Sequence, residues 1–192
     1  VWNTGALPVG AGHSLEIEAR VLIPPGLACT ITNPAPEVGD YFGQCVAGVG
    51  SDKIIVGAQY DGMGAPSAGS VHLFDTNGVL LVAIGNPTLA VSDWFGRSVA
   101  GLGADKIIVG ANGDDAGAPD AGSAYLFDAN GILLATTTNP APATNDYFGT
   151  SVAGLGADKI VVGASGDDAG ETNAGSVYLF DINGVLLATI TN

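Results

Sequence analysis

Short runs of apolar residues, separated by glycine-rich turns, follow one another along most of the chain. In the last part they occupy residues 151–155, 159–164, 176–181 and 185–190. An Asn-Gly pair separates the last two runs, and this pair favours a tight hairpin because both residues tolerate positive φ. No stretch has the sustained period of a helix. The pattern therefore predicts an all-β fold built of short antiparallel strands.

The same four-run pattern occurs three times without gaps. An aspartate opens each copy and an asparagine closes it, and both recur every 53 residues. These residues are Asp40, Asp93 and Asp146, and Asn33, Asn86, Asn139 and Asn192. Four antiparallel strands repeated in this way are typical of β-propeller blades. We therefore expect three full blades, at residues 35–87, 88–140 and 141–192.

Residues 1–34 contain only part of this pattern. Residues 11–34 are similar to the second half of a blade, with Pro24, Pro25 and Gly26 in place of the Asn-Gly turn. Apolar residues alternate with polar ones along residues 15–23, which favours a strand. We interpret this region as an N-terminal extension followed by a degenerate half-blade of two strands.

A Phe-Gly pair near the start of each copy and a later Val-Gly-Ala segment carry a family resemblance. They are Tyr41–Gly43 with Val56–Ala58, Trp94–Gly96 with Val109–Ala111, and Tyr147–Gly149 with Val162–Ala164. They resemble FG-GAP repeats, which form the β-propeller of integrin α-subunits and of many microbial surface proteins. The proline that ends that motif is Gln59, Asn112 or Ser165 here.

The Phe-Gly pairs themselves indicate packing rather than chemistry. An aromatic ring followed by glycine, once per blade, fills the space between neighbouring sheets and lets the backbone turn closely. We expect this structural role for Phe42, Gly43, Phe95, Gly96, Phe148 and Gly149.

Charge and composition narrow the classes of partner. The chain of 192 residues is 47% hydrophobic and only 12% charged, and its net charge is −14. This charge opposes binding to nucleic acid or anionic lipid and suits a soluble, extracellular or cell-surface protein. No apolar run approaches the roughly 20 residues that span a bilayer. Because the chain begins with Val1, we interpret it as a processed chain or a fragment.

The loop between the second and third runs is the best candidate for a metal site. Clustered carboxylate and carbonyl oxygens in a glycine-rich loop suit calcium. The candidate ligands are Asp114, Asp115 and Asp120 in the second copy, and Asp167, Asp168 and Asn173 in the third. The first copy keeps only Asp61, and the resemblance to integrins implies a calcium loop elsewhere, where this chain is too short for one. A solvated turn with local side-chain hydrogen bonds is the alternative.

The two cysteines, Cys29 and Cys45, both lie at the first junction between copies. In a chain expected outside the cell they favour a disulfide that ties the half-blade to the first blade. If fourth strands lie at the propeller rim and first strands near its axis, the two Cα atoms are too far apart for this bond. Buried free thiols or an intermolecular bond are then the alternatives.

The sequence argues against an enzyme and favours self-assembly. It contains no nucleophile with a histidine partner, no P-loop and no zinc motif. The third copy carries the same apolar residues as the second, without the polar face of a capping repeat. We therefore expect a structural protein that binds other copies of itself through its open blade face and its N-terminal strands, in a closed ring or a filament. An excerpt of a longer propeller, or an adhesion or glycan-binding module with a surface protein or glycan as partner, is the alternative.

Overall fold

The computed structural model describes residues 29–191, so most of the predicted half-blade at residues 1–34 lies outside the described residues. The described residues form twelve strands in three four-stranded sheets, which we call blades 1, 2 and 3. Blade 1 contains β1 (Cys45–Val49), β2 (Lys53–Ala58), β3 (Ser70–Asp75) and β4 (Leu80–Gly85). Blade 2 contains β5 (Ser98–Leu102), β6 (Lys106–Ala111), β7 (Ser123–Asp128) and β8 (Leu133–Thr138). Blade 3 contains β9 (Phe148–Leu155), β10 (Lys159–Ala164), β11 (Ser176–Asp181) and β12 (Leu186–Thr191).

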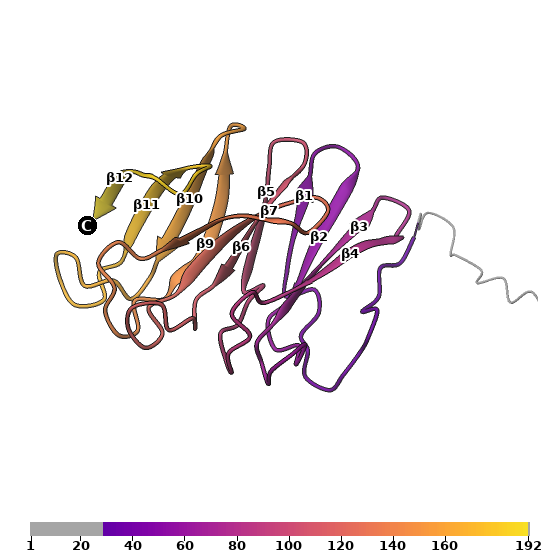
Figure 1. Ribbon diagram of the computed structural model, residues 1–192, viewed down its shortest axis with the longest axis horizontal. Helices are drawn as coiled ribbons and strands as arrows, with labels where there is room; N and C mark the ends of the chain where they lie inside the picture. The colour runs from indigo at the N-terminus through magenta and orange to yellow at the C-terminus, as the bar shows by residue number, and fades with distance from the viewer. Residues whose placement is uncertain (1–28, 192) are drawn as a thin grey trace, which may run out of the picture.

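Within every blade the strands follow chain order and pair antiparallel with their neighbours. Figure 1 shows the three sheets side by side along the long axis of the molecule. Their first strands are adjacent, with β5 between β1 and β9. The all-β prediction is confirmed, and the described residues contain no helix. In particular, none of them forms a helix that could cross a bilayer.

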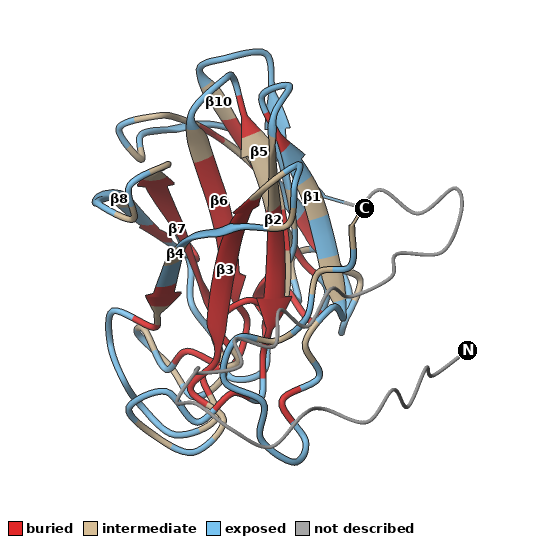
Figure 2. Cartoon of the chain, turned by 90° about the vertical axis from the view of Figure 1, so that its right-hand side faces the viewer, coloured by how far each residue is buried: buried red, intermediate tan, exposed pale blue. Residues whose placement is uncertain are grey.

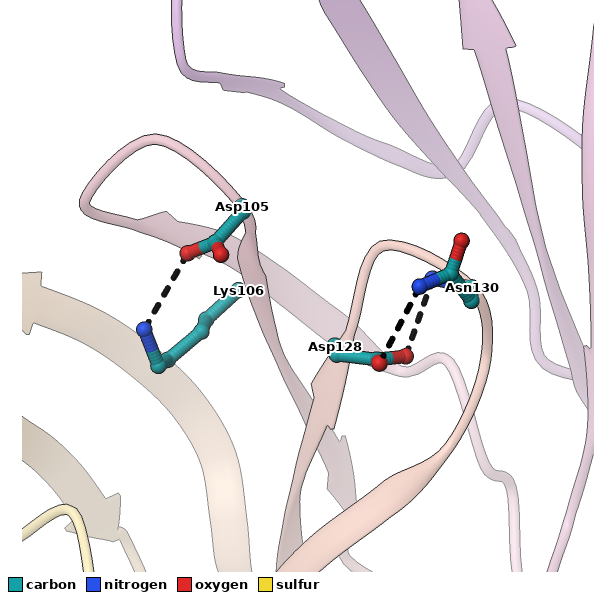
Figure 3. A network of polar contacts seen from close by, with 4 residues as sticks. All are labelled: Asp105, Lys106, Asp128 and Asn130. Carbon is teal, nitrogen blue, oxygen red and sulfur yellow. Dashed lines mark hydrogen bonds and ion pairs between the residues drawn. The ribbon is translucent and has the colours of Figure 1, made fainter.

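The third and fourth strands of each blade are joined by a tight turn that an aspartate holds. In blade 2, Asp128 accepts hydrogen bonds from the backbone N–H groups of Asn130 (2.9 Å) and Ile132 (2.8 Å), and Figure 3 shows its contacts with Asn130. These bonds lower the pKa of Asp128, as the equivalent bonds do for Asp75 and Asp181. The other contact in Figure 3 joins Lys106 to the preceding Asp105 at 3.1 Å. This ion pair is exposed, so its contribution to stability is small.

The core lies between the blades rather than inside any one of them. One cluster joins blades 1 and 2, and a second joins Leu102, Ile108 and Leu126 of blade 2 to Val162 and Phe180 of blade 3. Strands β2, β3 and β6 are largely buried (Figure 2). Strand β6 is covered on both faces because blade 2 lies between blades 1 and 3. Each large apolar side chain buried in this way contributes about 1.5–3 kcal/mol to stability. The stack of blades is thus stabilised mainly by contacts between successive repeats.

Candidate functional site

The Phe-Gly segment of one blade inserts into a loop of the blade before it. The backbone N–H of Phe95 donates to the carbonyl of Ala68, and that of Phe148 donates to the carbonyl of Ala121, both at 2.9 Å. A parallel bridge also joins Gly69 to Phe95, and another joins Gly122 to Phe148. The same contact is therefore made at both junctions between blades.

Glycine is required where this insertion takes place. Gly122 has a φ of +86°, and a Cβ atom on it would lie 2.0 Å from the carbonyl oxygen of Phe148. Gly69, with a φ of +89°, has the same 2.0 Å approach to the carbonyl oxygen of Phe95. The Ala-Gly-Ser segment before the third strand is thus shaped to receive the backbone of the next blade.

The aromatic ring of each Phe-Gly pair then packs within its own blade. Phe95 lies 5.7 Å from Tyr125 and 5.8 Å from Phe127, between ring centroids. Phe148 lies 5.6 Å from Tyr178 and 5.9 Å from Phe180. In blade 1 Phe42 makes the corresponding contacts with His72 and Phe74. The structure thus places all three rings among aromatic neighbours of their own sheet.

Blade 3 carries the receiving residues, but nothing in the described part of the chain is inserted between them. A groove of about 530 Å³ is lined there by residues that repeat those of the two occupied junctions. We call it the open socket, and its central residues are Gly163, Ala164, Ala174, Gly175, Ser176 and Val177. A Cβ on Gly175 would meet only backbone atoms of its own blade, the nearest being the carbonyl oxygens of Ala164 and Ser165 at 3.4 Å. No backbone of a following blade approaches this glycine in the described part of the chain, unlike Gly69 and Gly122.

Small polar and apolar side chains line the open socket, and its two large apolar side chains, Val177 and Ile190, are exposed. Val177 and Ile190 are 38% and 65% exposed, whereas Ala124 and Thr137, at the same repeat positions in blade 2, are 2% and 4% exposed. In β12, every residue is exposed. A contiguous apolar surface of this kind is typical of an interaction site.

The acidic loops that sequence suggested as calcium sites make internal hydrogen bonds. Asp114 accepts a hydrogen bond from the hydroxyl of Tyr125, and Asp167 accepts one from Tyr178. Burial, together with these bonds to aspartate, raises the pKa of both tyrosines far above its usual range. The first aspartate of each pair therefore holds the loop against the third strand.

The remaining candidate ligands close the loop on itself. Asp115 accepts from the backbone N–H of Asp120 at 2.9 Å, and Asp168 accepts from that of Asn173 at 2.7 Å. Among residues 29–191, no group of three or more His, Cys, Asp or Glu side chains is arranged to hold a metal ion. Local hydrogen bonds of this kind are expected for a solvated turn, which was the alternative to a metal site. Calcium binding stays a prediction from the sequence.

The recurring Asn and Asp of the sequence pattern meet in space. Asn33 donates to Asp40 at 2.7 Å, Asn86 to Asp93 at 2.5 Å and Asn139 to Asp146 at 2.6 Å. Asp93 and Asp146 are buried, and burial raises the pKa of both carboxyl groups. The pair closes the loop that leads from one blade to the next, a contact that the spacing alone did not reveal.

The predicted disulfide between Cys29 and Cys45 is not formed, and both thiols are free. The Cys29 thiol donates to the carbonyl of Thr76, in the turn between β3 and β4, at 3.6 Å. The Cys45 thiol, on β1, donates to the carbonyl of Gly96 at 3.0 Å, just as the Ser98 hydroxyl donates to that of Gly149 at 2.8 Å. Burial raises the pKa of Cys45 to about 11, so its thiol is protonated and unreactive. Cys29 thus lies beside the turn between β3 and β4, whereas Cys45 lies on β1, at the edge of blade 1 opposite to β4.

The family model of the FG-GAP repeat matches residues 30–74, 88–127 and 137–180. The chain belongs to the FG-GAP repeat family. Each matched segment covers the first three strands of one blade, including its Phe-Gly pair. The three sheets are therefore FG-GAP propeller blades, as the resemblance implied.

Solved structures show weaker likeness to this FG-GAP chain. A protein of unknown function from Bacteroides caccae matches with a TM-score of 0.49 and 13% identity, over 80% of this chain and 47% of that one. A eukaryotic initiation factor matches with a TM-score of 0.45 and 14% identity, over 77% of this chain and 31% of that one. The chain thus spans less than half the length of either protein. No curated protein matches it.

Proposed function

We propose that this FG-GAP chain is a structural propeller subunit, outside the cell or on its surface, that binds further copies of itself through the open socket of blade 3. The observation that carries the proposal is the repetition of the socket. The residues that hold Phe95 and Phe148 at the two junctions recur in blade 3, around a groove of about 530 Å³. Because a Phe-Gly segment occupies each of the two equivalent junctions, we expect a segment with the same backbone conformation to fit this groove.

Blade 1 of a second copy offers such a segment. Its Tyr41–Gly43 has the same sequence pattern as the two inserted segments, and Tyr41 is 64% exposed. Tyr41 also has a φ of +54°, close to the +56° of Trp94 and the +55° of Tyr147. The segment is therefore held in the conformation that its two counterparts adopt inside their sockets.

Repeated head-to-tail contacts of this kind give a ring if the rotation closes and a filament if it does not. Burial of Val177 and Ile190 would supply part of the driving force, at about 25 cal/mol per Å² of apolar surface. FG-GAP repeats are typical of extracellular or surface proteins, and the net charge of −14 suits that location. The proposed role is structural and includes no catalytic step. The predicted contribution of the N-terminal strands to self-assembly involves residues that lie mostly outside the described range.

The test is the oligomeric state of the wild-type chain and of Val177→Glu, measured by sedimentation velocity and electron microscopy over a range of concentrations. We expect the wild type to form oligomers or fibres as concentration rises and Val177→Glu to remain monomeric, because a buried unpaired charge opposes the contact. Val185→Glu is the matched control, since Val185 is also exposed but does not line the socket. A wild type that stays monomeric, or a Val177→Glu variant that assembles equally well, would contradict the proposal. A monomeric wild type would instead favour an excerpt of a longer propeller.

A further inference from the structure

A second cavity crosses all three blades at the end of the sheets where the first strands begin. Its volume is about 430 Å³, and three sets of repeat-equivalent residues line it. Each set has one member from every blade. The first set consists of the aromatic residues that precede the Phe-Gly pairs, Tyr41, Trp94 and Tyr147. Tyr60 adds a fourth ring, 5.1 Å from that of Tyr41 in an edge-on arrangement. We call this cavity the aromatic pocket.

Polar side chains complete its lining. Gln44, Arg97 and Thr150 follow the Phe-Gly pairs, and Asn112, with its counterparts in blades 1 and 3, follows the second strands. Arg97 donates one hydrogen bond to Gln59 at 3.3 Å, which links blade 2 to blade 1. Among the described residues Arg97 forms no ion pair with a carboxylate. Its remaining N–H groups are therefore free to bind a ligand.

Asn112 is the polar group that most needs a partner. Its side chain is only 7% exposed, and no group in the described part of the chain donates a hydrogen bond to its Oδ1 atom. A buried amide oxygen without a donor costs about 1–3 kcal/mol. Asn112 lines the aromatic pocket, but its Oδ1 atom is itself buried, so a ligand that brings a hydrogen-bond donor removes this cost when the amide turns toward it.

The repeats also differ from one another at this pocket. The counterparts of Tyr60 in blades 2 and 3 are Gly113 and Gly166. The counterparts of Arg97 in blades 1 and 3 are Gln44 and Thr150. Residues that only build the blade, such as the Phe-Gly pairs, are the same in all three copies. These substitutions make the three parts of the pocket lining chemically different from one another.

We propose that the aromatic pocket binds a neutral saccharide. Sugar hydroxyls both donate and accept, so one can donate to Asn112 Oδ1 while another accepts from Arg97. The apolar C–H face of a sugar ring packs against exposed aromatic side chains such as Tyr60. An anionic ligand is disfavoured by the net charge of −14. This site adjoins the open socket, since Thr150 and Ser165 line both, but binding of a sugar in it does not require a second copy of the chain.

The test is isothermal titration calorimetry of the Val177→Glu variant, which removes effects of assembly, with maltohexaose, cellohexaose, xylohexaose and mannohexaose at millimolar concentrations. We expect at least one of these neutral hexaoses to bind. Asn112→Ala and Arg97→Ala should each weaken that binding by about tenfold, which corresponds to about 1.4 kcal/mol. Asn130→Ala is the matched control, because Asn130 is an exposed amide in a distant hairpin and should leave the affinity unchanged.

Three results would overturn the proposal. The first is that no hexaose binds, and the second is that Asn112→Ala and Arg97→Ala bind as tightly as the parent Val177→Glu variant. The third is that only sodium sulfate or an acidic peptide gives a heat of binding, and no hexaose does. Circular dichroism of each variant shows whether the fold is intact. If Arg97→Ala unfolds, Gln44→Ala replaces it, since Gln44 lines the same pocket from an exposed position. Failure of the wild type to assemble would leave this site unaffected, so the two proposals are tested separately.

Discussion

One buried position differs in chemistry between the three blades. Tyr125 and Tyr178 donate to Asp114 and Asp167, but blade 1 has His72 at this position. The Nδ1 atom of His72 has no hydrogen-bond partner in the described part of the chain. Asp61 accepts instead from the hydroxyl of Ser70 at 2.6 Å. Burial lowers the pKa of His72, since the charged imidazolium is disfavoured among apolar neighbours.

We therefore predict that His72→Tyr stabilises the chain and changes its pH dependence. A group whose pKa is lowered by folding contributes stability that is full above its unfolded pKa of about 6.5 and is lost as the pH falls through its folded pKa. The wild type should thus lose more stability between pH 7 and pH 5 than His72→Tyr, in which residue 72 no longer titrates in this range. The new hydroxyl should also add about 0.5–1.5 kcal/mol by bonding to Asp61. Thermal unfolding at both pH values checks this, and parallel pH profiles would contradict it.

The closing Asn of each copy should matter more than an exposed Asn of the same type. In Asn139→Ala, buried Asp146 loses a donor at 2.6 Å, which should cost about 1–3 kcal/mol of unfolding free energy. Asn183→Ala is the control, because Asn183 is exposed in a hairpin and its side chain donates only at 3.4 Å. It should change stability by about 0.5 kcal/mol or less. Urea denaturation measures both, and equal losses would show that the Asn139 contact is not special.

The strands could be predicted from sequence because alternation, Asn-Gly turns and repetition all agreed. Two strands differ in their bounds: β12 is Leu186–Thr191 rather than residues 185–190, and β9 begins at Phe148 rather than Ser151, because a register shift next to Ala164 brings Phe148 into the ladder. The contacts between repeats were harder to predict. Neither the Asn–Asp pair nor the insertion of Phe148 beside Gly122 can be read from a pattern that describes one blade at a time.

The junction between blades can be probed with two glycines at equivalent positions. We predict that Gly122→Ala destabilises the chain by about 1–3 kcal/mol more than Gly175→Ala. Both glycines have positive φ, +86° and +79°, so both substitutions strain the backbone. Only at Gly122 would the new Cβ meet the backbone of the next blade, 2.0 Å from the Phe148 oxygen.

The comparison is made by denaturant unfolding at a dilution where the protein is monomeric. The difference between the two variants then isolates the contact between blades from the cost of positive φ. Equal destabilisation would mean that the inserted segment yields easily, and would weaken the argument that the open socket is specific.

The same contact joins blade 1 to blade 2 and blade 2 to blade 3, and blade 3 carries the corresponding socket without an inserted segment in the described part of the chain. Sequence predicted an open face from the lack of capping residues, and the structure adds the socket residues and their exposure. The sequence could not predict the aromatic pocket, because Tyr41, Trp94 and Tyr147 are far apart in the chain and come together only when the first strands lie side by side. Arg97 and Asn112 likewise acquire meaning only from their shared cavity.

The net charge of −14 per copy opposes the association that we propose, and this opposition gives a last prediction. Copies of equal charge repel one another at low salt, whereas the contact around Val177 and Ile190 is apolar. Raising the ionic strength from about 0.01 M to about 0.15 M shortens the Debye length from about 30 Å to about 8 Å. Association of the wild type, followed by sedimentation velocity, should therefore strengthen with salt, while Val177→Glu stays monomeric throughout. A contact made by ion pairs would weaken with salt instead, so the sign of the change distinguishes apolar docking in the socket from association through charged loops.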